Sequence, residues 1–325
     1  AGSLAPGTYT RTITVTAAGA SNSPQTITVN LTVLPAGTTH YQFDYANRTA
    51  FLNAGWDYLA RTANGTARNT ETTTGATVAY NHNGALRIPA DIGDLWAGAN
   101  NTRNSIFRDL PTNWTSATAK IRFAPTQNTQ QAGLVIYQDD DNYVQITRAY
   151  VNGQNVSLVN EHNGDAAVTH AAATTATDFY LRLERTNGTT ITAAYSTDGT
   201  TWNTVGTQNR ALTNPRLGLI VTASPSGFPP ADIQWVRVQR NIQPTLAIDK
   251  STLDFVTTQG QNPAAQTFAI SNSTEGTLNW ATSIGGTGPA WLTVSPTSGT
   301  GARTVTANVN AGSLAPGTYT RTITV

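Results

Sequence analysis

The chain begins and ends with the same fifteen residues, AGSLAPGTYTRTITV, at positions 1–15 and 311–325. Identity over so many positions does not arise by chance, so this repeat constrains the fold more than any other feature of the sequence. It predicts one full period of a tandem array, and a recent local duplication is the alternative. No signal-peptide pattern follows Ala1, and we expect the chain to be the interior of a longer protein.

Both ends of the chain show the alternation of apolar and polar residues that is typical of half-buried strands. Residues 8–16 and 26–33 alternate in this way. Two strands alone are marginal in water, so they need a sheet to join. The C-terminal part supplies short strands that we expect at residues 253–256, 266–270, 278–282, 291–294 and 304–309. Residues 1–15 and 311–325 would compete for one place in a sheet, so each is expected to belong to a different sandwich.

The C-terminal sequence resembles a known module. Residues 290–299, AWLTVSPTSG, followed by ARTVTANVNAGSLAPGTYTRTITV, are similar to a BACON domain, an immunoglobulin-like module of bacterial surface and secreted proteins. The resemblance implies that residues 244–325 form such a sandwich without its final strand. Residues 1–36 would be the last strands of the same kind of domain.

The middle of the chain, residues 37–243, is expected to hold a second and larger sandwich. Strands are predicted at residues 119–123, 133–138, 143–149, 156–160, 179–184, 190–196, 202–206, 217–222 and 233–239, with at most a short helix within 47–60. Turn residues separate these strands, and so many short strands favour a jelly-roll sandwich. Threonine, which suits a pleated and half-exposed surface, occurs 58 times. The predicted fold class is therefore all-β.

Three segments of this middle region resemble the concanavalin A-like domain that follows the catalytic domain of family 43 β-xylosidases. They read FRDLPTNWTSATAKIRFAPTQ, QQAGLVIYQDDDNYVQITR and YSTDGTTWNTVG, and the likeness runs from about residue 43 to residue 238. The resemblance implies a lectin-like fold without catalytic residues of its own. It also implies carbohydrate binding, although the same fold serves as a passive spacer.

Strand alternation predicts which side chains face away from the core of this sandwich. Aromatic rings and planar hydrogen-bonding groups on an open sheet face suit sugar rings and their hydroxyls, and an ordinary solvated face is the alternative. The candidate carbohydrate-binding residues are Arg122, Tyr143, Gln145, Tyr180, Arg182 and Glu184, with Trp96 as the tryptophan expected to be most exposed.

Other candidate sites are weaker. The run Asp139, Asp140 and Asp141 could bind Ca²⁺, which takes carboxylate oxygens, and a polar hairpin turn is the alternative. No other cofactor is expected. The candidate glycosylation sites are the asparagines of eight Asn-x-Ser/Thr sequons, Asn30, Asn47, Asn64, Asn100, Asn113, Asn155, Asn187 and Asn272.

Composition and the absence of motifs argue against several classes of function. A net charge of +1 with 11% charged residues gives no field to steer nucleic acid, and no apolar run is long enough to cross a membrane. The chain has no cysteine, its four histidines have no metal-ligand spacing, and no nucleophile or phosphate motif occurs, so we expect no enzyme.

The sequence thus predicts a non-enzymatic repeat unit of a long extracellular or cell-surface protein or fibre, with a lectin-like module for carbohydrate binding and adhesion. A purely structural stalk, or an accessory region of a secreted glycoside hydrolase, is the alternative. The expected partners are a polysaccharide or glycan and neighbouring copies of the same repeat, in series or as filament subunits.

Overall fold

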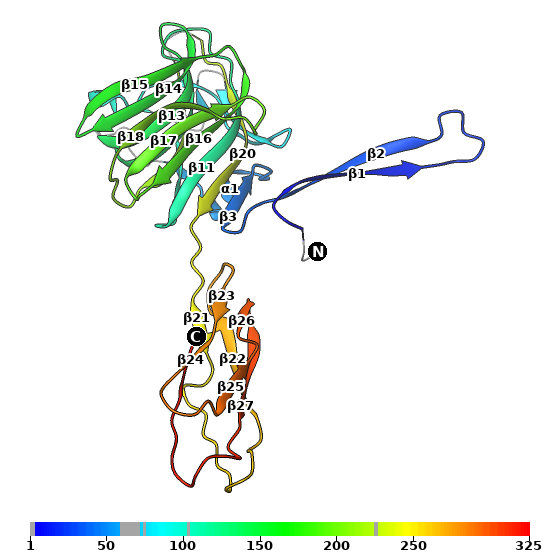
Figure 1. Ribbon diagram of the computed structural model, residues 1–325. Coiled ribbons are helices and arrows are strands. Elements are labelled where there is room, and N and C mark those ends of the chain that lie inside the picture. The colour runs from blue at the N-terminus through cyan, green and yellow to red at the C-terminus, as the bar shows by residue number, and fades with distance from the viewer. Residues whose placement is uncertain (1–3, 59–71, 74–75, 103–104, 224–226) are drawn as a thin grey trace. The chain divides into compact units, whose positions relative to one another are not determined.

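The computed structural model describes residues 4–58, 72–73, 76–102, 105–223 and 227–325, and it consists almost entirely of β-strands (Figure 1). This confirms the predicted all-β class. The chain divides into two compact units, Ala1–Asn241 and Ile242–Val325. A short helix, α1 (Arg48–Asn53), begins after Asn47, whose side chain accepts a hydrogen bond from the Ala50 N–H. No helix among the described residues is long and apolar enough to cross a membrane.

Two eight-stranded sheets form most of the N-terminal unit. The first sheet has the order β15 (Asp165–Ala173), β14 (Gln154–His162), β13 (Asn142–Tyr150), β12 (Gln131–Asp139), β19 (Arg216–Ala223), β10 (Ile106–Asp109) and β4 (Asp57–Tyr58), with β9 (Asp91–Ile92) parallel to β19. The second sheet has the order β18 (Asn203–Asn209), β17 (Thr190–Ser196), β16 (Asp178–Thr186), β11 (Trp114–Arg122), β20 (Ala231–Arg240), β8 (Ala85–Ile88) and β7 (Ala79–His82), with β3 (Thr38–Gln42) paired to β20. A separate pair joins β5 (Thr72–Thr73) to β6 (Ala76–Thr77).

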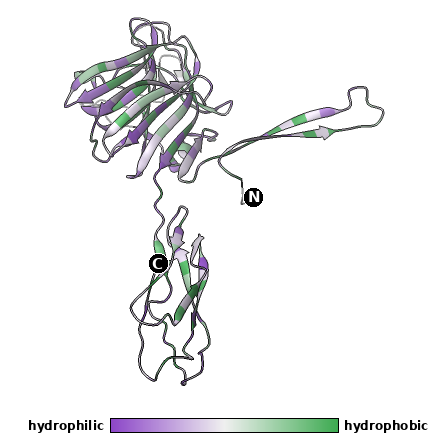
Figure 2. Ribbon diagram, in the orientation of Figure 1, coloured by the Kyte–Doolittle hydropathy of each residue, from purple (hydrophilic) through white to green (hydrophobic). Residues whose placement is uncertain are grey.

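The two sheets pack face to face around one apolar core, which confirms the predicted sandwich. Alternate residues of each strand supply it, such as Ile121 of β11 and Leu181 of β16 from the second sheet and Val144 and Ile146 of β13 from the first. Figure 2 shows this alternation of apolar and polar residues along the strands. The alternation leaves the other face of each sheet for different contacts.

The outer face of the first sheet is covered by the segment around η1 (Ala97–Ala99). Leu95 packs there against Tyr143 and Val159 in a second apolar cluster. The Glu161 carboxylate accepts a hydrogen bond from the Ala97 N–H at 2.9 Å, and Asp94 accepts one from the Gln131 side chain at 3.1 Å. This face is therefore closed to solvent along much of β12, β13 and β14.

The N-terminal strands form an isolated hairpin. β1 (Gly7–Val15) pairs with β2 (Gln25–Val33) over nine residues, and the two make a sheet of their own. Nearly every residue of both strands is exposed, including Ile27, Val29 and Leu31. The hairpin thus carries an apolar face that its own two strands leave uncovered.

The C-terminal unit contains a four-stranded sheet and two strand pairs around a small core that includes Phe268, Trp280 and Val305. The sheet has the order β21 (Leu246–Ile248), β22 (Gln266–Asn272), β27 (Arg303–Val309) and β25 (Leu292–Ser295). The pairs join β23 (Asn279–Ala281) to β26 (Ser298–Thr300) and β24 (Ser283–Gly285) to β28 (Thr322–Thr324). The strand predicted at residues 253–256 is absent, and that segment is unpaired.

Candidate functional site

The outer face of the second sheet gathers aromatic and basic side chains from neighbouring strands. Antiparallel register places Trp235 opposite Lys120 and Lys120 opposite Tyr180, in one row across β20, β11 and β16. The next row runs from His40 through Arg237 and Thr118 to Arg182. Directly opposite residues point to the same face of a sheet, so both rows face outward together. We call this surface the aromatic–basic face and define it by His40, Lys120, Tyr180, Arg182, Trp202, Trp235 and Arg237.

The rings of this face lie close to one another and to the cations. The centroid of the Trp235 ring lies 5.8 Å from that of Tyr180 and 5.7 Å from that of His40. The guanidinium carbon of Arg237 lies 4.0 Å from the Trp235 centroid, and that of Arg182 lies 4.1 Å from the Trp202 centroid. Stacking on a ring holds each guanidinium flat while leaving its N–H groups free to point to a ligand.

His40 and Arg237 form a directed polar pair beside Trp235. The Arg237 Nε–H donates to His40 Nδ1 at 3.1 Å, while His40 Nε2 lies 3.2 Å from the Gln42 side-chain oxygen. Burial is the main cause that lowers the pKa of His40; the bond to Gln42 opposes this, and the charge of Arg237 adds to it. His40 is therefore neutral at pH 7 and serves as a hydrogen-bond acceptor for Arg237.

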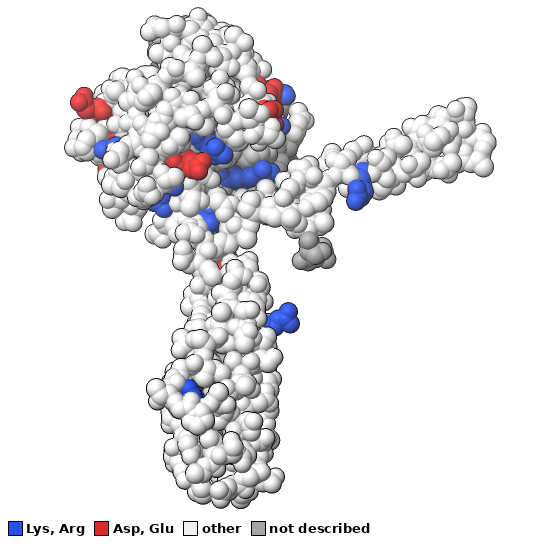
Figure 3. Space-filling view, in the orientation of Figure 1, with Lys and Arg blue, Asp and Glu red and all other residues white. Residues whose placement is uncertain are grey.

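The face has more positive charge than its ion pairs neutralise. Arg122 pairs with Asp178 at 3.0 Å, and Arg182 pairs with Glu184 at 3.4 Å. Neither Lys120 nor Arg237 forms a salt bridge with a carboxylate of the described residues. In Figure 3 basic side chains lie beside an acidic group over the strands labelled β11, β16 and β20 in Figure 1.

A shallow hollow of about 150 Å³ adjoins the row that contains Arg237. Thr118, Arg237 and Gln239 line it from the sheet, and Leu34 and Pro35 line it from the segment that precedes β3. The hollow is lined by hydroxyl, amide and guanidinium groups. The rest of the face is open.

Four of the predicted carbohydrate-binding residues lie on this outer face. Tyr180 and Arg182 belong to the aromatic–basic face itself, and Arg122 and Glu184 flank it on the same strands. Sequence reasoning missed His40, Trp202, Trp235 and Arg237. The signal for Trp235 and Arg237 was present, because they alternate with the core residues Val236 and Val238 within a predicted strand.

The other three predicted binding residues lie on the opposite side of the sandwich, so they do not contribute to this surface. Tyr143 and Gln145 do point away from the main core, but both are only 1% exposed beneath the segment around η1. Gln145 donates a hydrogen bond to Gln131 at 2.7 Å. Trp96 is 38% exposed and precedes η1 on that same side. Alternation predicted the direction of these side chains but not the segment that covers them.

The covering segment also buries two carboxyl groups. Burial is the main cause that raises the pKa of Asp94 to about 6, and burial likewise raises the pKa of Glu161. Both groups accept hydrogen bonds across the contact between the covering segment and the sheet, Asp94 from Gln131 of β12 and Glu161 of β14 from the Ala97 N–H. We interpret them as a structural network.

The three aspartates of the predicted calcium site accept hydrogen bonds from different partners. Asp139 accepts hydrogen bonds from the Asp141 N–H at 3.0 Å and the Asn142 side chain at 2.9 Å. Asp140 accepts one from the Tyr137 hydroxyl at 2.8 Å, and Asp141 accepts one from the Asn100 amide at 3.1 Å. Across the described ranges no three His, Asp or Glu side chains gather as metal ligands would. This geometry favours the hairpin turn, and calcium binding stays a prediction.

The predicted glycosylation sites differ in exposure. Asn30, Asn47, Asn113 and Asn187 are exposed, and Asn272 is half-buried. Asn100 and Asn155 are 6% and 8% exposed, so they cannot carry a glycan in the folded protein. Asn64 lies outside the described residues.

Comparison with known proteins agrees with this architecture. Residues 66–218 match the family of β-xylosidase C-terminal concanavalin A-like domains, and residues 245–325 match the viral BACON domain. These matches confirm the two resemblances, to a concanavalin A-like domain in the N-terminal unit and to a BACON domain in the C-terminal unit. No curated protein matches the chain.

Two similar solved structures are the GH43 protein BlXynB from Bacillus licheniformis and a mutant of it. The mutant has a TM-score of 0.52 and 19% identity, with 62% of this chain and 39% of that chain covered. The unmutated protein has a TM-score of 0.51 and 19% identity, with 65% of this chain and 41% of that chain covered. The chain spans about two fifths of their length, and the likeness establishes the fold.

Proposed function

We propose that the protein is a non-enzymatic, extracellular carbohydrate-binding unit of a repetitive surface protein, and that the aromatic–basic face holds the glycan. The observation that carries this proposal is the cross-strand row of Trp235, Lys120 and Tyr180 beside the row of His40, Arg237 and Arg182. Rings offer apolar surface to the C–H side of a sugar, and planar guanidinium groups offer paired donors to its oxygens.

The charge of the face points to the class of glycan. Lys120 and Arg237 lack a carboxylate partner within the described part of the chain, so a ligand that brings its own anion would satisfy both. A uronic acid or another acidic sugar supplies such a group together with a ring that can pack on Tyr180. The polar hollow beside Arg237 offers further hydrogen-bonding groups to the same ligand.

Absence of enzymatic activity is part of the proposal. The carboxyl groups of the face are paired with arginines, as in Arg122–Asp178 and Arg182–Glu184, and the protonatable pair Asp94 and Glu161 lies on the covered side of the sandwich. Glycosidases need two carboxyl groups on either side of an accessible glycosidic bond. A passive spacer remains the alternative function for a sandwich of this kind.

Affinity electrophoresis tests the proposal with gels that contain polygalacturonic acid or neutral arabinoxylan. We expect the 325-residue protein to be retarded by the acidic polysaccharide, and Trp235→Ala to weaken this binding at least about tenfold. Trp96→Ala is the matched control, because it removes a partly exposed tryptophan from the other side of the sandwich and should bind as the parent does. Equal loss in both variants, or no retardation by either polysaccharide, would contradict the proposal.

A further inference from the structure

The repeated fifteen-residue sequence adopts two different pairings. Its first copy supplies β1, which is paired with β2 along its whole length from Gly7 to Val15. In its second copy only β28 (Thr322–Thr324) is paired, with β24 (Ser283–Gly285). Residues 317–321, which are identical to residues 7–11, belong to no strand. The second copy therefore leaves residues 317–321 without the strand partner that residues 7–11 have in β2.

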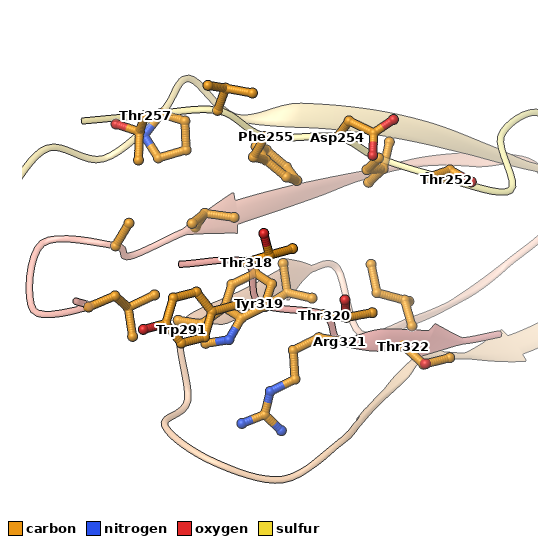
Figure 4. A pocket seen from close by; sticks show the side chains of 18 of the residues that line it. Thr252, Asp254, Phe255, Thr257, Trp291, Thr318, Tyr319, Thr320, Arg321 and Thr322 are labelled. Atoms are coloured by element: carbon orange, nitrogen blue, oxygen red, sulfur yellow. The ribbon is translucent and has the colours of Figure 1, made fainter. Parts of the chain in front are cut away.

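A long groove runs beside this unpaired edge. It has a volume of about 880 Å³, and residues 250–259 line one wall while residues 314–323 line the other. Phe268, Trp291 and Leu292 of the C-terminal core also line it. Figure 4 shows the segment that carries Thr252, Phe255 and Thr257 facing the segment that carries Thr318, Tyr319 and Arg321 across the opening. The groove thus lies between two segments that belong to no strand over most of their length.

The wall opposite the repeat is the segment whose sequence predicts a strand. Residues 253–256 alternate as a strand does, and Leu253 and Phe255 are half-buried against the core. The segment is nevertheless unpaired, and Val256 is 92% exposed. A strand forms only beside a hydrogen-bonding partner, so a strand pattern without one indicates that the partner is missing from this unit.

The register of the hairpin shows which segment fits. Tyr9, Arg11 and Ile13 lie opposite residues of β2, namely Leu31, Val29 and Ile27, and opposite residues share a face. In the second copy Ile323 and Val325 turn to the C-terminal core, whereas Thr318, Thr320 and Thr322 are exposed. A β2 strand paired to residues 317–325 in the same register would therefore place its apolar side chains in the groove and its threonines outside.

We propose that this groove is the docking site for the Gln25–Val33 strand of a second copy of this sequence. The fit follows from the hairpin, because β2 already pairs over nine residues with β1, whose sequence is identical to residues 317–325. Moving β2 from β1 to residues 317–325 would replace the backbone hydrogen bonds lost from β1, with residues 322–324 pairing to β2 on the edge that β24 does not use. The net gain is burial of Ile27, Val29 and Leu31, which are 54%, 43% and 48% exposed in the hairpin. This is strand addition to an open sheet edge, and it does not rest on the carbohydrate-binding proposal.

Peptide binding to the 325-residue protein tests the proposal. We expect a fluorescent peptide of residues 16–36 to bind with one site per chain. The Val29→Asp peptide should bind at least about tenfold more weakly, because it would bury an unpaired charge. The Thr28→Asp peptide is the matched control, since its substituted side chain faces away from the groove and should leave binding unchanged. No binding of the parent peptide, or equal binding of the Val29→Asp peptide, overturns the proposal.

A fusion variant locates the bound strand. Appending the sequence of residues 16–36 after Val325 lets the groove close within one molecule. The C-terminal unit should then melt about 10 °C or more higher, and the free peptide should no longer bind. An unchanged melting temperature overturns the proposal. Peptide binding that persists in the fusion variant also overturns it, because the peptide would then occupy another edge, such as that of β1.

Discussion

His40 couples the pH of the solution to the geometry of the aromatic–basic face. Its neutral Nδ1 accepts the Arg237 Nε–H at 3.1 Å, and protonation would remove this acceptor and place two cations side by side. Because the pKa of His40 is lowered in the folded protein, the unfolded chain takes up a proton first as the pH falls. The contribution of His40 to the free energy of unfolding therefore decreases below about pH 6.5, down to the lowered pKa.

The His40→Gln variant isolates this effect, because glutamine offers an oxygen acceptor that does not titrate. We expect the free energy of unfolding of the parent to decrease relative to that of the variant as the pH is lowered from 7.5 to 5. Urea unfolding of both proteins at the two pH values measures it. A stability difference that is the same at both pH values would show that His40 is not held neutral by its neighbours.

Single residues also show which features of the site the sequence could predict and which it could not. Alternation along β13 predicted that Val144 and Ile146 face the core and that Tyr143 and Gln145 face away, and this is what the structure has. Whether a face is open depends on a segment about 50 residues earlier in the chain, and no local pattern predicts the path of that segment. Trp235 could be found from its own strand, but its proximity to Tyr180 depends on the order of β20, β11 and β16.

The β12–β13 hairpin shows how an acidic run can stabilise a turn. Burial alone would raise the pKa of Asp139, but hydrogen bonds from Asn142, Gln138 and the Asp141 backbone outweigh it, so the pKa is lowered. The carboxylate therefore bonds the turn best when ionised. This role of Asp139 needs no cation.

We expect Asp139→Ala to destabilise the protein by about 1 kcal/mol through loss of these hydrogen bonds. A chelator should leave the melting temperature of the parent unchanged under this interpretation. Thermal melts of parent and variant, each with and without EDTA, separate the two hypotheses. A fall in the parent's melting temperature on chelation, absent in Asp139→Ala, would instead support the predicted calcium site, because a ligand of the folded state stabilises it by mass action.

The longer strands of the two large sheets were mostly predictable from their own sequences, whereas short paired strands such as β8 and β10 were not. The nine strands expected in the middle of the chain overlap strands of the two large sheets, because their alternation and turns agree with their pairing. β15 (Asp165–Ala173) was missed, since its alanine-rich sequence lacks apolar alternation. The prediction of a strand at 253–256 was wrong for the opposite reason. Its sequence has the pattern of a strand, but no neighbouring strand of its unit pairs with it.

At the scale of the whole molecule, the two proposed surfaces belong to different units. The aromatic–basic face lies on the N-terminal unit and the strand-docking groove lies within the C-terminal unit. Assembly through the groove would use none of the residues that define the aromatic–basic face. Repetition then multiplies a weak single contact into strong overall binding, without any change in the face itself.

The hairpin of β1 and β2 has a mechanical consequence. The chain enters β1 at Gly7 and leaves β2 at Val33, and these two residues are paired at the same end of the hairpin. Tension applied along the chain would therefore break the backbone pairs one after another, starting from Gly7 and Val33, rather than all at once. Each opened hairpin would release about 90 Å of extended chain. Single-molecule pulling should detect a low-force step of this length before either compact unit unfolds, and its absence would show that β2 is held from its other edge.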